Sequence, residues 1–372
     1  MIRIVYVSEA LIRNSGVTSV IVNLIHNISK DDIKIDLLTY KNSDKEILDD
    51  LKKCGVNIFY MPELSFKSFL TFKKSIDDFF ECHEYDVVHS HFNQIDGIVF
   101  KIAKSHGVKV CISHSHNTKL SDSTFKAIRN RILCYRLPKE ATVWAACSEE
   151  AGKCLYGKRF TNSSKKLIIR NGIDSRKFKY NDEYRRTIRN EFGIKEDTIL
   201  LGNIGGFRTQ KNHVFLIDVF NELIKHSNKY KLLLVGDGEL RHSIEKKVIN
   251  LGIQNYVIFA GTRTDIEKIM SAIDLFILPS LYEGLPVVGI EAQAAGLNCI
   301  FSDSITRNAN LTNVIFISLN EKIEKWCETI QRMDISRHYE YQEMIINKGF
   351  DISNECKRLT EFYINSIKEK NK

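Results

Sequence analysis

The segment "DLFILPSLYEGLPVVGIEAQAAGLNCIFSDS" (residues 274–304) places a helical pattern between two short apolar runs. The runs "LFIL" and "CIF" are continuously apolar, as strands are when both faces of their sheet are covered. A Gly-Leu-Pro turn leads from the first run into a helix that ends near Gly296. A buried strand, a helix and a second buried strand in series predict a parallel βαβ unit.

The same alternation occurs in two series along the chain. One series extends from "IRIVYV" (residues 2–7) to "KKLIIRNGID" (residues 165–174), and the other from "TILLGNIGG" (residues 198–206) to "NCIFSDS" (residues 298–304). Apolar strands separated by helices indicate parallel sheets with helices on both faces. We therefore expect an α/β protein with two Rossmann-like, doubly wound domains, and ligands at the carboxyl ends of the strands in the cleft between them.

The length of 372 residues is too great for one ordinary core and suits two domains. The polar Asn-Gly break near residues 171–174 predicts the linker. We expect an N-terminal acceptor-binding domain at residues 1–172 and a C-terminal nucleotide-sugar-binding domain at residues 173–350. Helical patterns fill residues 320–346 and the final segment, 351–372, which we expect to pack back on the first domain.

The composition excludes several classes of protein. With 43% hydrophobic and 27% charged residues the chain resembles a globular protein, and no apolar run approaches the roughly 18 residues of a membrane span. The first residues lack the pattern of a signal peptide, so we expect a cytoplasmic location. The nine cysteines form no C-x-x-C pair, which predicts reduced thiols and neither a disulfide framework nor a zinc site made of cysteines.

Two carboxylates, Glu283 and Glu291, interrupt the apolar segment around the Gly-Leu-Pro turn. A buried carboxylate needs hydrogen-bond partners. A sugar or ribose diol would supply them, and so would a neighbouring backbone group or an arginine; the residues alone leave both open. The free amides of the helix that follows the turn are suited to hold a phosphate or sugar oxygen.

The motif E-G-L-P-V-V-G-I-E (residues 283–291) resembles the signature of the retaining nucleotide-sugar glycosyltransferases of family 4, which have the GT-B fold of two facing Rossmann-like domains. The similarity extends to "HSHN", "ACSEEAG", "QKNHVFLIDVF" and "VGDGEL", and it is strongest to bacterial enzymes of capsule, exopolysaccharide or O-antigen synthesis. The resemblance implies that Glu291 binds the nucleotide ribose and that Glu283 holds a hydroxyl of the donor sugar. It also assigns contacts with sugar and phosphate to the main chain of Gly284, Leu285, Pro286 and Val287.

The resemblance also exposes two departures from the family pattern. The family neutralises the diphosphate with an arginine and, five residues on, a lysine. Lys211 matches the lysine, but Gly206 stands in place of the arginine, so Arg208 or Arg263 would have to supply the second cation. Where the family has two adjacent glycines after the first strand, this chain has Ser-Gly, which makes Gly16 the candidate for the donor loop.

Two H-S-H triplets supply His89, His91, His114 and His116. Residues i and i+2 share one face of a strand, so the four imidazoles are either zinc ligands or residues that line the cleft. The resemblance places His116 at the donor sugar.

The chain lacks a D-x-D triplet. We therefore expect the lysine, an arginine and helix amides to stabilise the leaving diphosphate without a metal, and we expect no cofactor. In "VGDGEL" the glycines Gly236 and Gly238 are expected to shape a strand-to-helix turn.

Most of the formal net charge of +8 lies in the first half, and residues 119–139 are its most basic stretch. Ser121, Asp122 and Ser123 are expected to cap a helix there, and its apolar stripe consists of Phe125, Ile128, Ile132 and Tyr135. The helix either packs on the sheet in the ordinary way or docks on an anionic membrane surface. No motif accompanies the charge that would indicate nucleic-acid binding.

Together these features predict a retaining, metal-independent hexosyl- or N-acetylhexosaminyltransferase. We expect it to move a sugar from a nucleotide-diphosphate donor, a UDP-sugar by preference, to a glycan acceptor that is lipid-linked, in bacterial surface polysaccharide synthesis at the inner face of the cell membrane. Two alternatives remain: a nucleotide-sugar epimerase of GT-B form, and a catalytically degenerate sugar-nucleotide-binding subunit, which Gly206 would explain.

Overall fold

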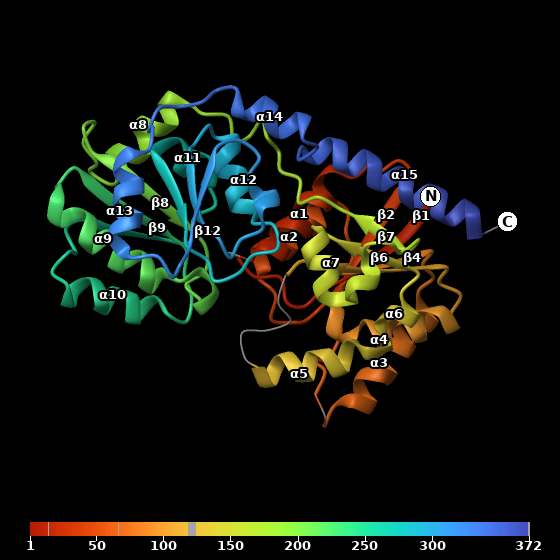
Figure 1. Ribbon diagram of the computed structural model, residues 1–372. Helices are drawn as coiled ribbons and strands as arrows, with labels where there is room; N and C mark the ends of the chain where they lie inside the picture. Colours follow the sequence, from red (N-terminus) through yellow and green to blue (C-terminus); the bar gives the residue numbers. More distant parts are fainter. Residues whose placement is uncertain (14, 66, 118–123, 371–372) are drawn as a thin grey trace. The chain divides into compact units, whose positions relative to one another are not determined.

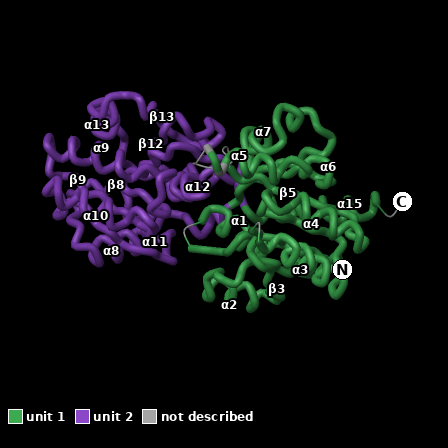
Figure 2. Tube along the Cα trace, turned by 90° about the horizontal axis from the view of Figure 1, so that it is seen from below, with its two compact units in different colours: residues 1–172, 352–372 green, residues 173–351 purple. Residues whose placement is uncertain are grey.

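The computed structural model describes residues 1–13, 15–65, 67–117 and 124–370. The chain forms two compact units (Figure 2). Unit 1 comprises Met1–Gly172 together with Ile352–Lys372, and unit 2 comprises Ile173–Asp351.

Unit 1 contains a sheet of seven parallel strands in the order β3-β2-β1-β4-β5-β6-β7. Figure 1 labels β1, β2, β4, β6 and β7 of this sheet. Its central strands are buried along their whole length, as their β-branched and apolar residues predict. The strands are β1 (Ile2–Val7), β2 (Ile33–Thr39), β3 (Ile58–Tyr60), β4 (Val87–Ser90), β5 (Val110–Ser115), β6 (Val143–Ala146) and β7 (Lys166–Ile168).

Helices follow the strands of unit 1, as a doubly wound fold requires. The last helix belongs to this unit although it comes after unit 2 in the chain: its buried Tyr363 hydroxyl lies 3.1 Å from the Tyr6 hydroxyl of β1, and Glu355 accepts a hydrogen bond from the Arg170 amide. The helices are α1 (Gly16–Asn27), α2 (Lys45–Lys53), α3 (Phe69–Cys82), α4 (Asn93–Ser105), α5 (Thr124–Leu133), η1 (Cys134–Arg136), α6 (Leu137–Glu140), α7 (Glu149–Tyr156), η2 (Lys158–Phe160) and α15 (Ile352–Lys370).

Unit 2 has the same architecture, with a sheet of six parallel strands in the order β10-β9-β8-β11-β12-β13. The strands are β8 (Ile199–Ile204), β9 (Tyr230–Val235), β10 (Val257–Gly261), β11 (Leu275–Leu278), β12 (Cys299–Ser302) and β13 (Val314–Ile317). The helices are α8 (Asp182–Glu191), η3 (Thr209–Lys211), α9 (His213–His226), α10 (Arg241–Asn250), α11 (Ile266–Ala272), α12 (Val287–Ala294), η4 (Arg307–Ala309), α13 (Ile323–Arg332) and α14 (Tyr341–Asn347).

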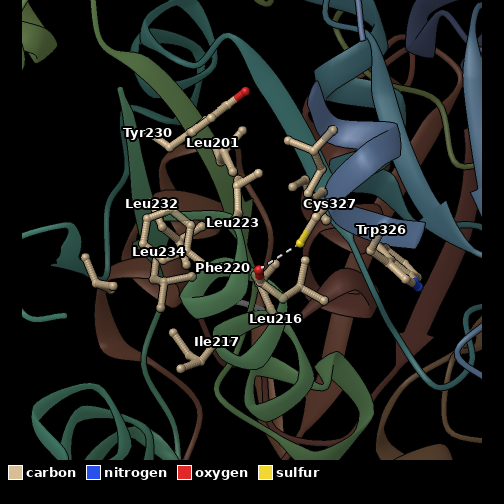
Figure 3. Close-up of a cluster of buried hydrophobic side chains, with 14 of the residues drawn as sticks. Leu201, Leu216, Ile217, Phe220, Leu223, Tyr230, Leu232, Leu234, Trp326 and Cys327 are labelled. Carbon is tan, nitrogen blue, oxygen red and sulfur yellow. Dashed lines mark hydrogen bonds between the residues drawn. The ribbon is translucent and has the colours of Figure 1, made fainter. Parts of the chain in front are cut away.

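The core of unit 2 lies between its sheet and the helices α9 and α13 (Figure 3). Leu216, Phe220 and Leu223 of α9 face Leu201 and Leu232 of the sheet, and all five are buried. Burial of each such side chain contributes roughly 1.5–3 kcal/mol. This core fixes the strands whose carboxyl ends carry the residues discussed below.

The helical pattern of residues 320–346 forms two helices, because α13 ends at Arg332 and α14 begins at Tyr341. The segment between them brings Arg337 inward, where its guanidinium donates hydrogen bonds to the carbonyls of Ala295, Met270 and Ser271. These carbonyls lie at the ends of α11 and α12, where helices leave carbonyl groups without intrahelical partners. Arg337 therefore caps the ends of α11 and α12 from the segment that separates α13 and α14.

Candidate active site

The strand order of unit 2 reverses between the neighbouring strands β8 and β11. From β8 the chain proceeds through β9 and β10 to one edge of the sheet, and from β11 it proceeds through β12 and β13 to the other. In open α/β sheets such a switch point opens a crevice for ligands at the carboxyl ends of the strands. The loops after β8 and β11 carry Lys211, Glu283 and the residues around them.

The loop after β8 rests on the turn after β9. Gly236 and Gly238 have φ values of 138° and 157°, which side chains rarely adopt. A Cβ atom on Gly236 would lie 2.1 Å from the Gly205 oxygen, and one on Gly238 would lie 2.7 Å from the Phe207 oxygen. The prediction that these glycines shape the turn is confirmed, and their second effect is to let the turn support the Lys211 loop.

Three hydrogen bonds join the loop after β8 to the loop after β11. The Gln210 side chain donates to the Tyr282 oxygen at 3.0 Å, the Leu281 amide donates to the Gln210 oxygen at 2.8 Å, and the Asn212 side chain donates to the Pro279 oxygen at 3.2 Å. Asn212 has a left-handed backbone (φ 55°), which asparagine tolerates better than most residues. These contacts hold both loops in register.

The consequence of this register is an ion pair between Lys211 and Glu283. The Lys211 Nζ lies 2.6 Å from the Glu283 Oε1, which also accepts a hydrogen bond from the Ser280 hydroxyl at 3.1 Å. Glu283 is 8% exposed and Lys211 is half-buried, so the pair is shielded from most of the solvent. Charge-assisted hydrogen bonds of this kind are short and strong. The structure thus brings two predicted site residues together.

Glu291 lies on α12 in a different environment. Its side chain is half-buried, and no described residue donates a hydrogen bond to its carboxylate. Burial raises the pKa of Glu291 to about 7; nearby Lys177 lowers this pKa, and Glu267 raises it. The alternative in which a backbone group or an arginine pairs with Glu291 is therefore not found among the described residues.

Of the two candidates for the missing arginine, Arg263 is already engaged. Its guanidinium pairs with Glu191 at 2.5 Å and with Asp265 at 2.8 Å. Arg208 is exposed in the loop that leads to Lys211, and it forms no ion pair with any residue that the structure describes. Of the two candidates, Arg208 is therefore the one whose positive charge no carboxylate of the described residues compensates.

The turn after Glu283 leads into α12, which begins at Val287 with Pro286 as its N-cap. Gly284, Leu285 and Val287 are buried, and the first amides of any helix lack intrahelical partners. In unit 1, Gly16 opens α1 behind the N-cap Ser15. A Cβ atom there would meet no atom within 4 Å, so packing within unit 1 does not require this glycine.

The four histidines come together at the carboxyl ends of β4 and β5 in unit 1. Neighbouring rings lie 4.1–5.4 Å apart between centroids. His89 and His114 are fully buried, His91 is 7% exposed and His116 is half-buried. Burial lowers the pKa of all four, that of His116 to about 3, and the neighbouring imidazoles lower the pKa of the other three further. The cluster is therefore uncharged at neutral pH.

The comparison with known proteins identifies the family. Residues 14–177 match the family described as Glycosyltransferase Family 4, and residues 184–313 match Glycosyl transferases group 1. The Bacillus subtilis protein EpsF, named as a glycosyltransferase, is 32% identical over 379 residues, which cover 100% of this chain and 98% of EpsF. The chain belongs to the family 4 glycosyltransferases. The resemblance inferred from residues 283–291 is confirmed.

Other relatives of this glycosyltransferase agree with that assignment. A UDP-Gal:alpha-D-GlcNAc-diphosphoundecaprenol alpha-1,3-galactosyltransferase of Escherichia coli is 25% identical over 96% of this chain and 95% of its own. Anabaena Alr3699/HepE, solved in complex with UDP and glucose, superposes with a TM-score of 0.81 at 16% identity over 97% of this chain and 99% of its own. This likeness confirms the expected GT-B class of two Rossmann-like domains.

Sequence reasoning missed several residues that contact the candidate site residues. Gln210, Asn212 and Ser280 position Lys211 and Glu283, and Tyr363 contacts His89 from α15, far away in the chain. Gln210 and Asn212 flank Lys211, so polar side chains beside a strand end could have indicated their role from the sequence. No sequence pattern indicated the contact with Tyr363, because this contact depends on how the last helix folds back.

The basic segment of the glycosyltransferase lies only partly within the described residues, since residues 118–123 with the expected cap are outside them. The apolar stripe of α5 and η1 does not pack on the sheet: Phe125, Ile128, Ile132 and Tyr135 are 80%, 58%, 70% and 84% exposed. The packed-helix alternative is therefore wrong for these four residues. Within the described residues, no helix is both long and apolar enough to cross a membrane.

Proposed function

We propose that this glycosyltransferase transfers a hexosyl or N-acetylhexosaminyl group from a UDP-sugar to a lipid-linked glycan, with retention of the anomeric configuration, during synthesis of a bacterial surface polysaccharide. The names of two relatives support this role: the E. coli enzyme that uses UDP-Gal and a diphosphoundecaprenol acceptor, and the Staphylococcus aureus capsular enzyme CapH, which is 25% identical over 86% of this chain.

The unpartnered carboxylate of Glu291 carries the proposal. A half-buried carboxylate without a donor is costly, and two ribose hydroxyls would supply both missing hydrogen bonds. Hydrogen bonds to an ionised acceptor are also about twice as strong as neutral ones. Nucleotide binding then favours the ionised form of Glu291, and so lowers its pKa from about 7.

Lys211 and Glu283 act on the other end of the donor. In the free enzyme they neutralise each other at 2.6 Å. When the diphosphate binds, Lys211 turns toward the phosphate oxygens, and the Glu283 carboxylate accepts a hydroxyl of the sugar. Negative charge grows on the leaving diphosphate as the bond to the sugar breaks, so Lys211 and the first amides of α12 stabilise the transition state more than the ground state.

The remaining residues keep subordinate roles in the proposal. Arg208 replaces the family arginine as second cation, because Arg263 is bound by two carboxylates. The main chain from Gly284 to Val287 contacts the sugar and phosphate. In unit 1, Gly16 serves the donor loop and His116 contacts the donor sugar, as the resemblance implies.

We propose a reaction on one face of the sugar. The acceptor hydroxyl oxygen forms a bond with the anomeric carbon on the face from which the diphosphate leaves, and its proton passes to an oxygen of that diphosphate. No protein nucleophile takes part, and the cations and amides replace a divalent metal at the diphosphate. Addition of Mg²⁺ or Mn²⁺ is therefore expected to leave the rate unchanged, and a strict requirement for either ion would contradict this.

The decisive experiment measures UDP and UDP-sugar affinity for the wild type, Glu291→Gln and the control Glu343→Gln, whose side chain is exposed in unit 2. We expect Glu291→Gln to weaken binding about 10–100-fold, the equivalent of roughly 1.4–2.8 kcal/mol, and the control to bind like wild type. Equal affinities for all three proteins would refute the ribose role.

Product analysis then tests the reaction itself. With the best donor and a lipid-linked acceptor, NMR of the product should show the donor's anomeric configuration. Incubation with donor alone should leave the sugar unchanged, whereas an epimerase would convert it. Donor binding without transfer to any acceptor, even after Gly206→Arg, would instead support a catalytically degenerate subunit.

We further propose that α5 and η1 dock the enzyme on anionic lipid. Their exposed apolar stripe lies beside exposed Arg129, Arg131 and Arg136, a combination that binds membrane interfaces. Flotation with phosphatidylglycerol vesicles should recover the wild type but not Ile132→Ser, while Ile249→Ser is the control because Ile249 is 63% exposed in unit 2. Equal recovery of both variants would contradict the docking role.

A further inference from the structure

The histidine cluster of unit 1 leaves several ring nitrogens without partners. His91 Nε2, His114 Nε2 and His116 Nδ1 are buried and accept or donate no hydrogen bond within the described residues. Buried polar atoms are nearly always satisfied, and each exception needs an explanation. An ion bound in the cluster would be a partner for one of these atoms, His91 Nε2.

The distances suit a metal ion. One ring nitrogen from each of His89, His91 and His114 lies within 4.8 Å of the other two. The His89 Nε2 and His114 Nδ1 are 3.3 Å apart, which is long for a hydrogen bond. A tetrahedral ion with Zn–N bonds of about 2.0–2.1 Å holds its ligand atoms roughly 3.3 Å apart. This pair therefore has the separation of two ligands, and a ring nitrogen of His91 lies within 4.8 Å of both.

The outer contacts also resemble those of metal-binding histidines, whose second ring nitrogen usually donates a hydrogen bond. The His89 Nδ1 lies 2.5 Å from the Tyr363 hydroxyl, and the His91 Nδ1 lies 2.9 Å from the His116 Nε2. If the Nδ1 atoms of His89 and His91 carry the protons and donate these hydrogen bonds, the Nε2 atom of each ring keeps a lone pair that can bind a metal ion. The protein thus supplies an outer hydrogen bond for His89 and for His91, whereas His114 Nε2 has no partner among the described residues.

We propose that His89, His91 and His114 bind a divalent transition-metal ion, with Zn²⁺ as the ion in the cell. Three imidazoles and no thiolate or carboxylate are ligands that suit Zn²⁺, Ni²⁺ and Cu²⁺ rather than Mg²⁺ or Ca²⁺. The ion is structural: it joins β4 to β5 and, through Tyr363, both strands to α15. His116 is not a ligand, and its Nε2 accepts the hydrogen bond from His91. This site belongs to unit 1 and is independent of the proposed metal-free chemistry at the diphosphate, whose cations are in unit 2.

The first test uses untagged wild-type protein, so that no added histidines compete. Protein purified from zinc-supplemented cells and dialysed should contain about one zinc per chain by elemental analysis. Metal-free protein titrated with Co²⁺ should show the intense visible absorption of tetrahedral cobalt, and zinc should abolish it. Absence of stoichiometric zinc together with the weak spectrum of hydrated Co²⁺ would overturn the proposal.

Variants identify the ligands. His114→Gln should abolish the cobalt spectrum, whereas the control His242→Gln, which alters an exposed histidine of unit 2, should retain it. Because His114→Gln alters a buried cluster and can impair folding, Tyr363→Phe is the milder companion: it keeps the ring and removes only the hydroxyl that His89 contacts. Loss of that outer contact should weaken zinc binding about 10–100-fold. Unchanged affinity in a folded Tyr363→Phe protein would refute the assigned hydrogen-bond role, and undiminished binding in folded His114→Gln would refute the site.

These measurements do not depend on catalysis. A protein that binds UDP-sugars and transfers them but holds no zinc would overturn this inference and leave the proposed function intact. A protein that binds one zinc per chain but no UDP-sugar would support this inference and refute the proposed function.

Discussion

The two units share one topology, but the polar side chains near their switch points differ. In unit 1 the strand order reverses between β1 and β4, and in unit 2 it reverses between β8 and β11. Beside the first switch point, at the ends of β4 and β5, lie four uncharged imidazoles. The loops at the second carry an ion pair and a carboxylate for which no described residue is a donor. The fold therefore determines where polar residues gather, whereas the loops determine which ligand they suit.

Burial acts on both groups in the same way, by favouring the uncharged form. For the imidazoles this means a lowered pKa, and for Glu291 a raised pKa of about 7. The two switch points are consequently destabilised by opposite changes of pH. The following predictions test this contrast, from the largest expected effect to the smallest.

Acidification of the zinc-free protein should unfold unit 1 before unit 2. Since the imidazole pKa values are lowered in the folded state, their full stabilisation is present above the unfolded value of about 6.5 and is lost as pH falls toward the folded values, about 3 for His116. Asp96 has the opposite effect on stability, because burial raises its pKa to about 7. It is a single carboxyl group, whereas four imidazoles destabilise unit 1 as the pH falls. Unit 2 buries one imidazole of lowered pKa, His213 at about 4.

The two tryptophans allow this to be measured. Trp144 lies in unit 1 and Trp326 in unit 2, so Trp326→Phe and Trp144→Phe proteins report the two units separately by fluorescence. Between pH 6.5 and 4 the Trp144 signal should change first. If the two signals changed together, or if the Trp326 signal changed first, the prediction that unit 1 unfolds before unit 2 would be wrong.

Lys211→Ala should lower kcat by about 10²–10³-fold, as loss of a group that stabilises transition-state charge does elsewhere. It also leaves Glu283 buried without its cation. Steady-state kinetics with the best UDP-sugar provide the measurement. The matched control is Lys225→Ala, which removes an exposed lysine paired with Glu222 and should retain activity. A wild-type kcat for Lys211→Ala would show that Lys211 does not stabilise the leaving diphosphate.

Glu291→Gln should stabilise the ligand-free protein at pH 8 by up to about 3 kcal/mol, while it weakens nucleotide binding. The raised pKa means that Glu291 favours folding below the ordinary carboxyl value and that this benefit is lost as pH rises through about 7. Glutamine removes the cost of ionisation. Urea unfolding, followed by Trp326 fluorescence, measures the free energy of unfolding at pH 8 and at pH 5. The increase caused by Glu291→Gln should be larger at pH 8. An increase that is independent of pH would disprove the assignment of the raised pKa.

The smallest effect separates the two arginines. Arg208→Ala should lower kcat/KM about 10-fold, because it removes an exposed cation next to the Lys211 loop. Arg263→Ala should change kcat/KM less than about 3-fold, since Glu191 and Asp265 already compensate its charge. Kinetics with one donor compare the two proteins directly. A larger loss for Arg263→Ala would reverse the assignment.

The strands and the two Rossmann-like series were predictable because buried parallel strands are continuously apolar. The glycine turn at Gly236 and Gly238 was predictable for a similar reason, since few residues other than glycine adopt such φ values. The break between α13 and α14 was not, because Arg337 acts on carbonyls of remote helices. Nor did sequence indicate that Lys211 would pair with Glu283, which depends on contacts between two loops far apart in the chain.

The position of α15 has a consequence for synthesis of the protein on the ribosome. Unit 1 is begun first but completed last, because the helix that holds Tyr363 emerges only after all of unit 2. Domains generally fold as they emerge. The strands β1 and β4 therefore lack their contacts with Tyr363 of α15 for as long as unit 2 is being translated.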